Sequence, residues 1–218
     1  MKLSDQTVEV LQNFSSINQS LLFKKGSKLR TVSPQKTVLA EVEVGDVFAQ
    51  DFGIYDLGQF LSALSLIEDP DLDLGDNGMT IGDGNGTALA YRYADPSMIV
   101  TPPEKALTLP DVNATFTLSD ENLKSVLQAA RVLGVPEIIV KGEDGNITIS
   151  AGDSKNSSMN SFSKAVGSTD EEFEHVFKVD NMKMMVLEYN VEISSKGISK
   201  FSTADGRVTY YVATESRS

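Results

Sequence analysis

The sequence predicts an α+β protein made of two similar halves, in which helices cover one face of antiparallel sheets. Three observations support this fold class. The triplet Leu-Ser-Asp opens an amphipathic segment at Leu3 and opens another at Leu118. Short β-rich runs and then a second capped segment follow each of these openings. Between the halves, residues 95–110 contain four prolines and little periodic pattern, which indicates an extended connector.

The segment 118–134 is the best-defined predicted helix. Ser119 or Asp120 can accept the free amide hydrogens of its first turn, and Gly134 ends it shortly before Pro136. Apolar residues at helical spacing predict the buried face: Leu123, Val126, Leu127, Ala130 and Leu133. The outward face is expected to carry, three or four residues apart, Lys124, Gln128 and Arg131. Taken alone, such a face is typical of an ordinary solvated helix.

A similar helix is predicted near the start of the chain, within residues 1–18. Ser4 is its expected cap, and its inward stripe is expected to be Val8, Leu11, Phe14, Ser15 and Ile17. The run from Val10 to Gln12 also resembles the run from Val126 to Gln128, one residue out of step. A second start of this kind in the other half indicates a duplicated unit.

The remaining elements complete the two halves. In the first half we expect strands at Leu21–Phe23, Leu29–Ser33, Thr37–Val44, Val47–Ile54, Met79–Ile81 and Thr87–Tyr93, with a helix at Asp56–Ile67. In the second half we expect strands at Ala114–Leu118, Glu137–Lys141, Asn146–Ala151, Asn160–Val166, Glu174–Val179, Tyr189–Ser194, Ile198–Ser202 and Val208–Ala213. A short helix capped by Asp180 should precede the last three strands. The predicted domains are 1–94 and 111–218, with 95–110 as the connector.

Composition excludes several classes of protein. The 218 residues include no Cys, so a disulfide, a zinc–thiolate site and a thiol nucleophile are all impossible. The formal charge of −12 means that the chain as a whole repels nucleic acid and anionic membranes, so any DNA contact needs a local basic patch. No apolar run approaches the roughly 20 residues of a membrane span, and the polar N-terminus resembles no signal peptide.

No motif for catalysis, a cofactor or a metal is found. The spacing Gly82-x-Gly84-x-Gly86 is wrong for a dinucleotide loop, and a hairpin is expected there. Four carboxylates hint at calcium but miss the twelve-residue loop pattern: Asp71, Asp73, Asp76 and Asp83. The single histidine, His175, lies in an alternating segment and is expected at an ordinary strand position. With no Cys and one isolated His, most nucleophile–base pairs are excluded.

The basic residues are more informative. Cations cluster after the first helix at Lys24, Lys25, Lys28 and Arg30. Lys124 and Arg131 share a helix face, and Lys183 is expected on the short helix capped by Asp180. Scattered solvated lysines are the simpler explanation. If the helices share one surface, however, these cations predict a polyanion contact that reads the backbone and no sequence.

Several stretches resemble the sliding clamps, or DNA polymerase processivity factors, of T-even-type bacteriophages. They are MKLS at the start, LQNFSSIN at Leu11–Asn18, GIYDLGQFLSALSLI at Gly53–Ile67, ADPSMIV at Ala94–Val100 and NMKM at Asn181–Met184. The resemblance implies two similar domains of the DNA-clamp fold per chain and three chains in a closed ring, with helices lining the hole. It implies no enzymatic activity and no cofactor. It also implies partners in the cytoplasm of an infected bacterial host: duplex DNA, a replicative polymerase, an ATP-driven clamp loader and late-transcription factors.

The resemblance also suggests site residues. The DNA-facing set would be Lys24, Lys25, Lys28, Lys124, Arg131 and Lys183. The first helix departs from the family, because Asp5, Glu9 and Gln12 stand where family members tend to have lysines. A pocket for the C-terminal peptide of a partner would lie beside the connector, at Ile99, Val100, Leu107, Tyr211 and Val212. By analogy, ring closure would pair strand Thr87–Tyr93 of one chain with strand Asn160–Val166 of the next.

Two other classes of function remain open from the residues alone. An acidic, β-rich structural or adhesion protein of a virion would also lack Cys, and it would need no basic helix face. A carbohydrate-active enzyme is the third possibility and rests only on the abundant carboxylates. The native mass and a test of processive synthesis distinguish these classes.

Overall fold

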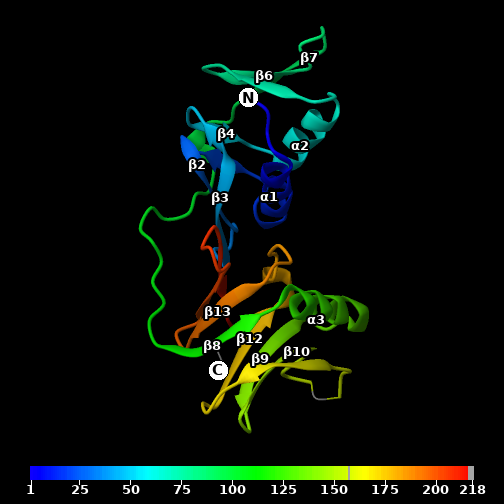
Figure 1. Ribbon diagram of the computed structural model, residues 1–218, viewed down its shortest axis with the longest axis vertical. Coiled ribbons are helices and arrows are strands. Elements are labelled where there is room, and N and C mark those ends of the chain that lie inside the picture. Colours follow the sequence, from blue (N-terminus) through cyan, green and yellow to red (C-terminus); the bar gives the residue numbers. More distant parts are fainter. Residues whose placement is uncertain (157, 216–218) are drawn as a thin grey trace. The chain divides into compact units, whose positions relative to one another are not determined.

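The computed structural model describes residues 1–156 and 158–215. The chain divides into two compact units, an N-terminal unit of Met1–Glu104 and a C-terminal unit that begins at Lys105. Figure 1 draws the N-terminal unit from blue to green and the C-terminal unit from green to red. Each unit combines antiparallel strands with one long capped helix. None of the helices in the described part has the length and hydropathy that a membrane span requires.

The N-terminal unit has three groups of strands and two α-helices. In chain order its elements are α1 (Asp5–Ile17), β1 (Leu21–Phe23), β2 (Gly26–Val32), β3 (Val38–Phe48), β4 (Phe52–Ile54), α2 (Leu57–Ser65), β5 (Asp71–Leu74), β6 (Gly78–Gly82), β7 (Ala88–Arg92) and the short 3-10 helix η1 (Pro96–Met98). Strand β1 pairs with β4, β2 with β3, and β6 with both β5 and β7, all antiparallel. Helix α1 contacts α2, β2 and β3.

Aromatic side chains form the centre of the N-terminal core. The rings of Phe23 and Phe52 stack with centroids 4.4 Å apart, and Phe48 meets Phe23 edge-on at 4.9 Å. Helix α1 adds the fully buried Leu11 and Phe14 to this unit. Burial of such side chains contributes roughly 1.5–3 kcal/mol each. The orientation of α1 is therefore fixed by its apolar side, which leaves the other side for solvent or a ligand.

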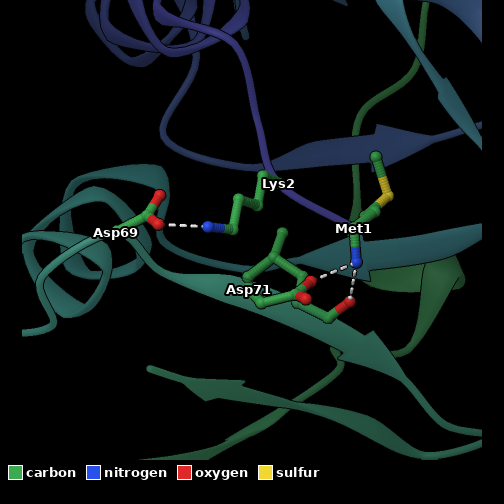
Figure 2. A network of polar contacts seen from close by, with 5 residues as sticks. Met1, Lys2, Asp69 and Asp71 are labelled. Atoms are coloured by element: carbon green, nitrogen blue, oxygen red, sulfur yellow. Dashed lines mark hydrogen bonds and ion pairs between the residues drawn. The ribbon is translucent and has the colours of Figure 1, made fainter. Parts of the chain in front are cut away.

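The residues ahead of α1 are joined to the sheet of β5, β6 and β7. The backbone nitrogen of Met1 donates to the Asp71 carboxylate and to the Leu72 carbonyl, the latter at 2.6 Å (Figure 2). The Leu72 amide donates back to the Met1 carbonyl at 2.8 Å. Lys2 forms an ion pair with Asp69. The start of the chain is thus held beside β5, and α1 begins from a fixed point.

The C-terminal unit has two antiparallel groups of four strands and the helix α3. Its elements are β8 (Val112–Leu118), α3 (Asp120–Leu133), β9 (Glu137–Glu143), β10 (Asn146–Gly152), β11 (Phe162–Ser168), β12 (Phe173–Lys178), the 3-10 helix η2 (Val179–Asn181), β13 (Tyr189–Ser194), β14 (Ile198–Ser202) and β15 (Val208–Ala213). One group has the order β11-β10-β9-β12, and in the other β8, β13, β14 and β15 pair in that order. Helix α3 contacts β9, β10 and β11.

The core of the C-terminal unit joins its two groups of strands. Phe177 of β12 meets Phe201 of β14 edge-on, with ring centroids 5.9 Å apart. Tyr189 lies between Phe201 and Tyr210, at 6.2 Å and 6.0 Å. Both tyrosines are fully buried, and the Tyr189 hydroxyl donates to the Met185 carbonyl at 2.8 Å. This packing gives α3 a rigid support.

The predicted caps of α1, α2 and α3 are confirmed. Ser4 accepts the Thr7 amide, Asp56 accepts the Gln59 amide, and Ser119, not Asp120, accepts the Asn122 amide. Gly134 ends α3 in the left-handed conformation, with φ of 64°, which glycine adopts without a Cβ clash. The buried side of α1 is shifted around the helix from the predicted stripe, because α1 packs on α2 as well as on strands. It includes Thr7 and Val10 and leaves Val8 and Ser15 half-exposed.

The predicted helix after Asp180 is wrong. Asp180 lies inside the single 3-10 turn η2, and the chain leaves helical geometry at Met182, with φ of −82° and ψ of 50°. Met182 and Met184 are buried while Lys183 between them is exposed, which is an alternating pattern, not a helical one. The methionines reach the core from a segment without regular secondary structure, and tertiary packing overrides the helical propensity of the run.

Two strands also differ from prediction. The runs Thr37–Val44 and Val47–Ile54 were expected as separate strands, but β3 continues through Gly45 and Asp46 and ends at Phe48. Its pairing with β2 shifts register between Glu43 and Phe48, so the turn-like pair Gly45-Asp46 lies in an irregular part of the ladder and does not end the strand. The carboxylates Asp71 and Asp73 belong to β5, an additional strand whose alternating pattern was hidden by its acidity.

Candidate nucleic-acid interface

The outer face of α3 carries a row of exposed polar side chains, which we name the α3 row: Lys124, Gln128 and Arg131. The opposite side of the helix buries Leu123, Val126 and Ala130. Lys124 and Arg131 are seven residues apart, which is about 10 Å along a helix axis. That is close to one Debye length at about 0.1 M salt, so both charges act on the same stretch of a polyanion.

The cations of the α3 row are electrostatically available. None of the ion pairs found among residues 1–156 and 158–215 involves Lys124 or Arg131. The acidic residues of α3, Asp120 and Glu121, occupy its first turn, where they complement the helix dipole. Glu121 lies 3.9 Å from the ammonium group of Lys164 on β11. Positive charge therefore accumulates toward the C-terminal end of α3.

Helix α1 presents a different face. Its cap Ser4 is equivalent to Ser119 of α3, so Glu9 stands at the position of Lys124 and Ser16 at the position of Arg131. The exposed residues of α1 are Asp5, Gln6, Glu9, Gln12 and Ser16. Neither α1 nor α2, both fully described, contains Lys or Arg. The helices of the N-terminal unit offer no attraction to a polyanion.

The cations after α1 are paired with carboxylates. Lys24 lies 2.8 Å from Asp51, and Lys28 and Arg30 lie 3.0 Å and 2.7 Å from the Glu41 carboxylate. Burial raises the pKa of Glu41, but the hydrogen bonds and charges of Lys28 and Arg30 outweigh it and hold the pKa below its usual range. Lys25 is exposed, and its backbone amide donates to Asp51 at 2.7 Å. Two carboxylates thus oppose four cations, so the charge of this cluster is neutralised only in part.

Lys183, the last predicted DNA-facing residue, is exposed in the segment after η2. It follows Met182 and precedes Met184, both buried. Its position is set by these two anchors and not by a helix.

The predicted pocket residues belong to two different units. Ile99 is buried beside Gly53, and a Cβ on that glycine would meet the Ile99 side chain at 2.7 Å. Val100 is 43% exposed and its carbonyl accepts the Asn18 side-chain amide. In the C-terminal unit, Leu107 and Tyr211 are half-exposed, while Val212 on β15 is fully buried.

Among the described residues, each unit ends one sheet at a strand that pairs on one side only, and an apolar groove lies beside that strand. In the N-terminal unit the groove between α2 and β7 has a volume of about 560 Å³, and its lining includes Tyr55, Ala63, Leu66, Leu89 and Tyr91. In the C-terminal unit the groove between α3 and β11 has about 440 Å³, and its lining includes Ala129, Val132, Leu133 and Phe162. Leu66 is 74% exposed and Val132 is 76% exposed. These grooves were not predicted, although apolar residues outside each helix's buried stripe were a signal for them.

The described residues hold no cluster of three or more His, Asp or Glu side chains suited to a metal ion. His175 lies on β12, as expected of an ordinary strand position, and its Nε2 is 2.9 Å from Oδ1 of Asn113.

Comparisons with known proteins agree along the whole chain. A model of the family "DNA polymerase processivity factor" matches residues 3–101, and one of "gp45 sliding clamp, C terminal" matches residues 115–216. The sliding clamp of Vibrio phage KVP40 is 36% identical over 221 aligned residues, which cover 99% of both chains. The sliding clamp of Enterobacteria phage T4 is 31% identical, covering 97% of this chain and 95% of the relative.

Solved structures show the same fold at low identity. A PCNA of A. fulgidus, solved with the C-terminal region of FEN-1, aligns with a TM-score of 0.69 at 18% identity over 97% of this chain and 95% of that one. A PCNA of Thermococcus kodakaraensis aligns with a TM-score of 0.68 at 17% identity, over 96% of both chains. The fold is therefore the clamp fold with two similar domains, and the chain belongs to the sliding clamps of T4-like bacteriophages.

Proposed function

We propose that three copies of this chain form a closed ring around duplex DNA and tether the replicative DNA polymerase of a bacteriophage. The match to sliding clamps over 99% of the chain carries this proposal. The ring performs no chemistry. An ATP-dependent clamp loader opens and closes it in the cytoplasm of the infected host, and late-transcription factors use it as a second platform.

The contact with DNA must be loose, because a clamp that reads bases or binds tightly cannot slide. A few cations facing the hole supply a hold on phosphates that is independent of sequence and sensitive to salt. Lys124 and Arg131 are suited to this role, since they are exposed and unpaired among the described residues. Lys183, Lys24, Lys25 and Lys28 complete the proposed DNA-facing set. The formal charge of −12 per chain keeps DNA from adhering to the outer surface.

Ring closure uses the two free strand edges. Strand β7 of one chain pairs with β11 of the next, which removes exposed edges that would otherwise promote aggregation. The groove beside β7 and the groove beside β11 then cover each other. This arrangement buries Leu66 and Val132, whose exposure in the single chain is otherwise unfavourable.

Partner proteins bind elsewhere, beside the connector 95–110 that joins the proposed domains 1–94 and 111–218. A short C-terminal peptide of the polymerase or the loader enters an apolar pocket. The proposed lining is Ile99, Val100, Leu107, Tyr211 and Val212. Of these, Val100 has the largest exposed fraction, 43%, and is suited to a first contact.

The test measures native mass and retention on DNA. The proposal expects a species near three times 23.6 kDa that stays on nicked circular DNA after loading and slides off when the circle is cut. It also expects faster synthesis on long templates with a cognate polymerase. A monomer, a large shell-like assembly, or equal retention on circular and linear DNA would overturn it.

A charge reversal tests the DNA contact within this proposal. Lys124→Glu with Arg131→Glu should weaken loading on DNA at least about tenfold at low salt while leaving the trimer intact. The control is Lys36→Glu with Lys155→Glu, which makes the same change in net charge at two exposed positions in other loops. Unchanged loading in the first variant, or equal loss in both, contradicts the assignment.

A further inference from the structure

We propose that, among the helices lining the hole, only α3 of the C-terminal unit attracts the duplex electrostatically. Helices α1 and α2 line the hole without attracting the phosphates. The inference rests on the proposed ring and adds which sectors of it hold DNA. The ring then has three attractive sectors, one per chain, separated by three neutral or repulsive ones.

The attractive sector is the α3 row. Lys124 and Arg131 lie on either side of Gln128, whose side chain also lines the groove beside β11, so the two cations carry the attraction. All three side chains are exposed. Among the described residues of the C-terminal unit, no carboxylate forms an ion pair with Lys124 or Arg131. The acidic first turn of α3 is offset by Lys164, which approaches Glu121 to 3.9 Å. The net field of the row is therefore positive over its last two turns.

Helix α1 lacks this attraction, because acidic and neutral residues occupy the positions equivalent to the cations of α3. When the two caps Ser4 and Ser119 are superposed in sequence, Glu9 replaces Lys124 and Ser16 replaces Arg131. Both residues are exposed, so they present a negative charge and a hydroxyl where α3 presents two cations. Helix α2 adds only small and amide groups, because its exposed residues are Gly58, Gln59, Ser62 and Ser65.

The cations that follow α1 offset this difference only in part, and none of them lies on a helix. Lys24 and Lys28 are each committed to a carboxylate, at 2.8 Å from Asp51 and 3.0 Å from Glu41. A phosphate would have to compete with these pairs, and the carboxylate left behind would repel it. The charges of Lys24 and Asp51 sum to zero, whereas Lys28 and Arg30 share the one negative charge of Glu41. Three cations against two carboxylates leave these pairs a net charge of +1, so only part of their positive field reaches the duplex.

The consequence is a grip confined to a few phosphates at a time. Each neutralised phosphate contributes about 0.9 to the slope of log affinity against log salt. Two cations per attractive sector thus predict a shallow salt dependence, and the duplex is drawn toward the α3 sectors. Such a weak attraction, made through few phosphates, favours sliding.

The experiment exchanges the two outer faces in the full-length ring. Glu9→Lys with Ser16→Arg copies the α3 row onto α1, and Lys124→Glu with Arg131→Ser copies the α1 face onto α3. Binding of a fluorescent blunt-ended duplex is measured from about 25 to about 200 mM salt. The first variant should bind about tenfold more tightly at low salt, with a salt slope steeper by up to about 2. The second should bind at least about tenfold more weakly, with a shallower slope.

A matched control is Lys36→Glu with Lys155→Ser, which makes the same change in net charge as the α3 variant at two exposed positions outside the proposed DNA-facing set and should change affinity less than about twofold. The inference is overturned if this control loses as much affinity as the α3 variant, or if the α1 variant binds like the unmodified chain. Native mass and retention on nicked circular DNA are measured for every variant. Loss of the ring in the unmodified chain would refute the proposed function itself, whereas an intact ring with equal contributions from α1 and α3 refutes only this inference.

Discussion

Helices α1 and α3 begin alike and present different surfaces. Each follows the triplet Leu-Ser-Asp, and each serine caps its helix by accepting the amide three residues later. Both helices pack an apolar side on strands of their own unit. On the outer side, however, Glu9 of α1 is equivalent to Lys124 of α3. The cap and the buried side are fixed by the fold, whereas the outer side is free to change with function.

The two helices also differ near their C-terminal ends. Ile17 of α1 is 3% exposed, while the equivalent Val132 of α3 is 76% exposed. Ile17 is part of the core of its own unit, so its burial needs no second chain. Val132 lines the groove between α3 and β11, where only another surface can cover it. The comparison thus separates a residue that stabilises a unit from one that is available for assembly.

The largest expected effect tests that separation. Val132→Asp should abolish the trimer and leave a folded monomer, because assembly would bury a carboxylate without a partner, at a cost of several kcal/mol. The free energy of unfolding of the monomer should change by less than about 0.5 kcal/mol, since Val132 is exposed there. Light scattering measures the mass, and urea unfolding measures the stability.

The control for this variant is Val47→Asp on β3. Val47 is 68% exposed, so the substitution adds the same charge at a similar exposure and lies outside both grooves. The control should remain trimeric. A trimer in the Val132 variant, or a monomer in both variants, would contradict the placement of the interface.

The sequence could predict these helices because their signals are local. A serine cap, apolar spacing and a terminal glycine fix α3 without knowledge of the rest of the chain. The segment after Asp180 could not be predicted in this way, because Met182 and Met184 are held by the core and not by helical hydrogen bonds. Propensity alone favours a helix there, and packing decides otherwise.

The candidate site shows the same limit. The spacing of Lys124 and Arg131 on a helix is enough to place them on one face. Spacing cannot show that Lys24 and Lys28 are paired, because Asp51 and Glu41 reach them from other strands or loops. The shared face of Lys124 and Arg131 was therefore predictable from the sequence. The ion pairs of Lys24 and Lys28 could be found only from the three-dimensional contacts.

The next largest effect concerns the two caps. Ser119→Ala should lower the free energy of unfolding by about 1 kcal/mol, the usual cost of removing a serine cap. Ser4→Ala should cost about 2 kcal/mol, because the Ser4 hydroxyl also donates to Asp46 at 2.8 Å. Urea unfolding of the two variants measures the difference.

The double variant Ser4→Ala with Asp46→Asn isolates the additional contact. If the hydroxyl and the carboxylate interact, its cost should be less than the sum of the two single costs by about 0.5–1.5 kcal/mol. Equal costs for the two cap variants, together with additivity in the double variant, would show that the Ser4–Asp46 contact contributes nothing.

The smallest expected effect is a difference between the two units in how their stability depends on pH. His175 is the single histidine of the chain, and it is 8% exposed in the C-terminal unit. Burial lowers its pKa below the ordinary value of 6.5. Its Nε2 faces Oδ1 of Asn113 at 2.9 Å, so the neutral ring already satisfies that acceptor. Protonation would place a second proton, and a charge, in a largely dry environment.

The sign follows from which state binds the proton. Between the folded-state pKa and about 6.5, the unfolded chain binds more protons, so stability rises with pH in that window. The contribution is complete above about pH 6.5 and is lost as the pH falls toward the folded-state value.

Peptide-resolved hydrogen exchange should therefore show strands β9 and β12 losing protection as the pH falls from about 7 to about 5.5, after correction for intrinsic exchange rates. The N-terminal unit, which contains no histidine, should keep its protection over the same range. His175→Gln retains a donor for Asn113 and removes the titration, so it should make the response of the C-terminal unit flat. Equal losses in both units, or a response that persists in the glutamine variant, would place the pH sensitivity elsewhere in the chain.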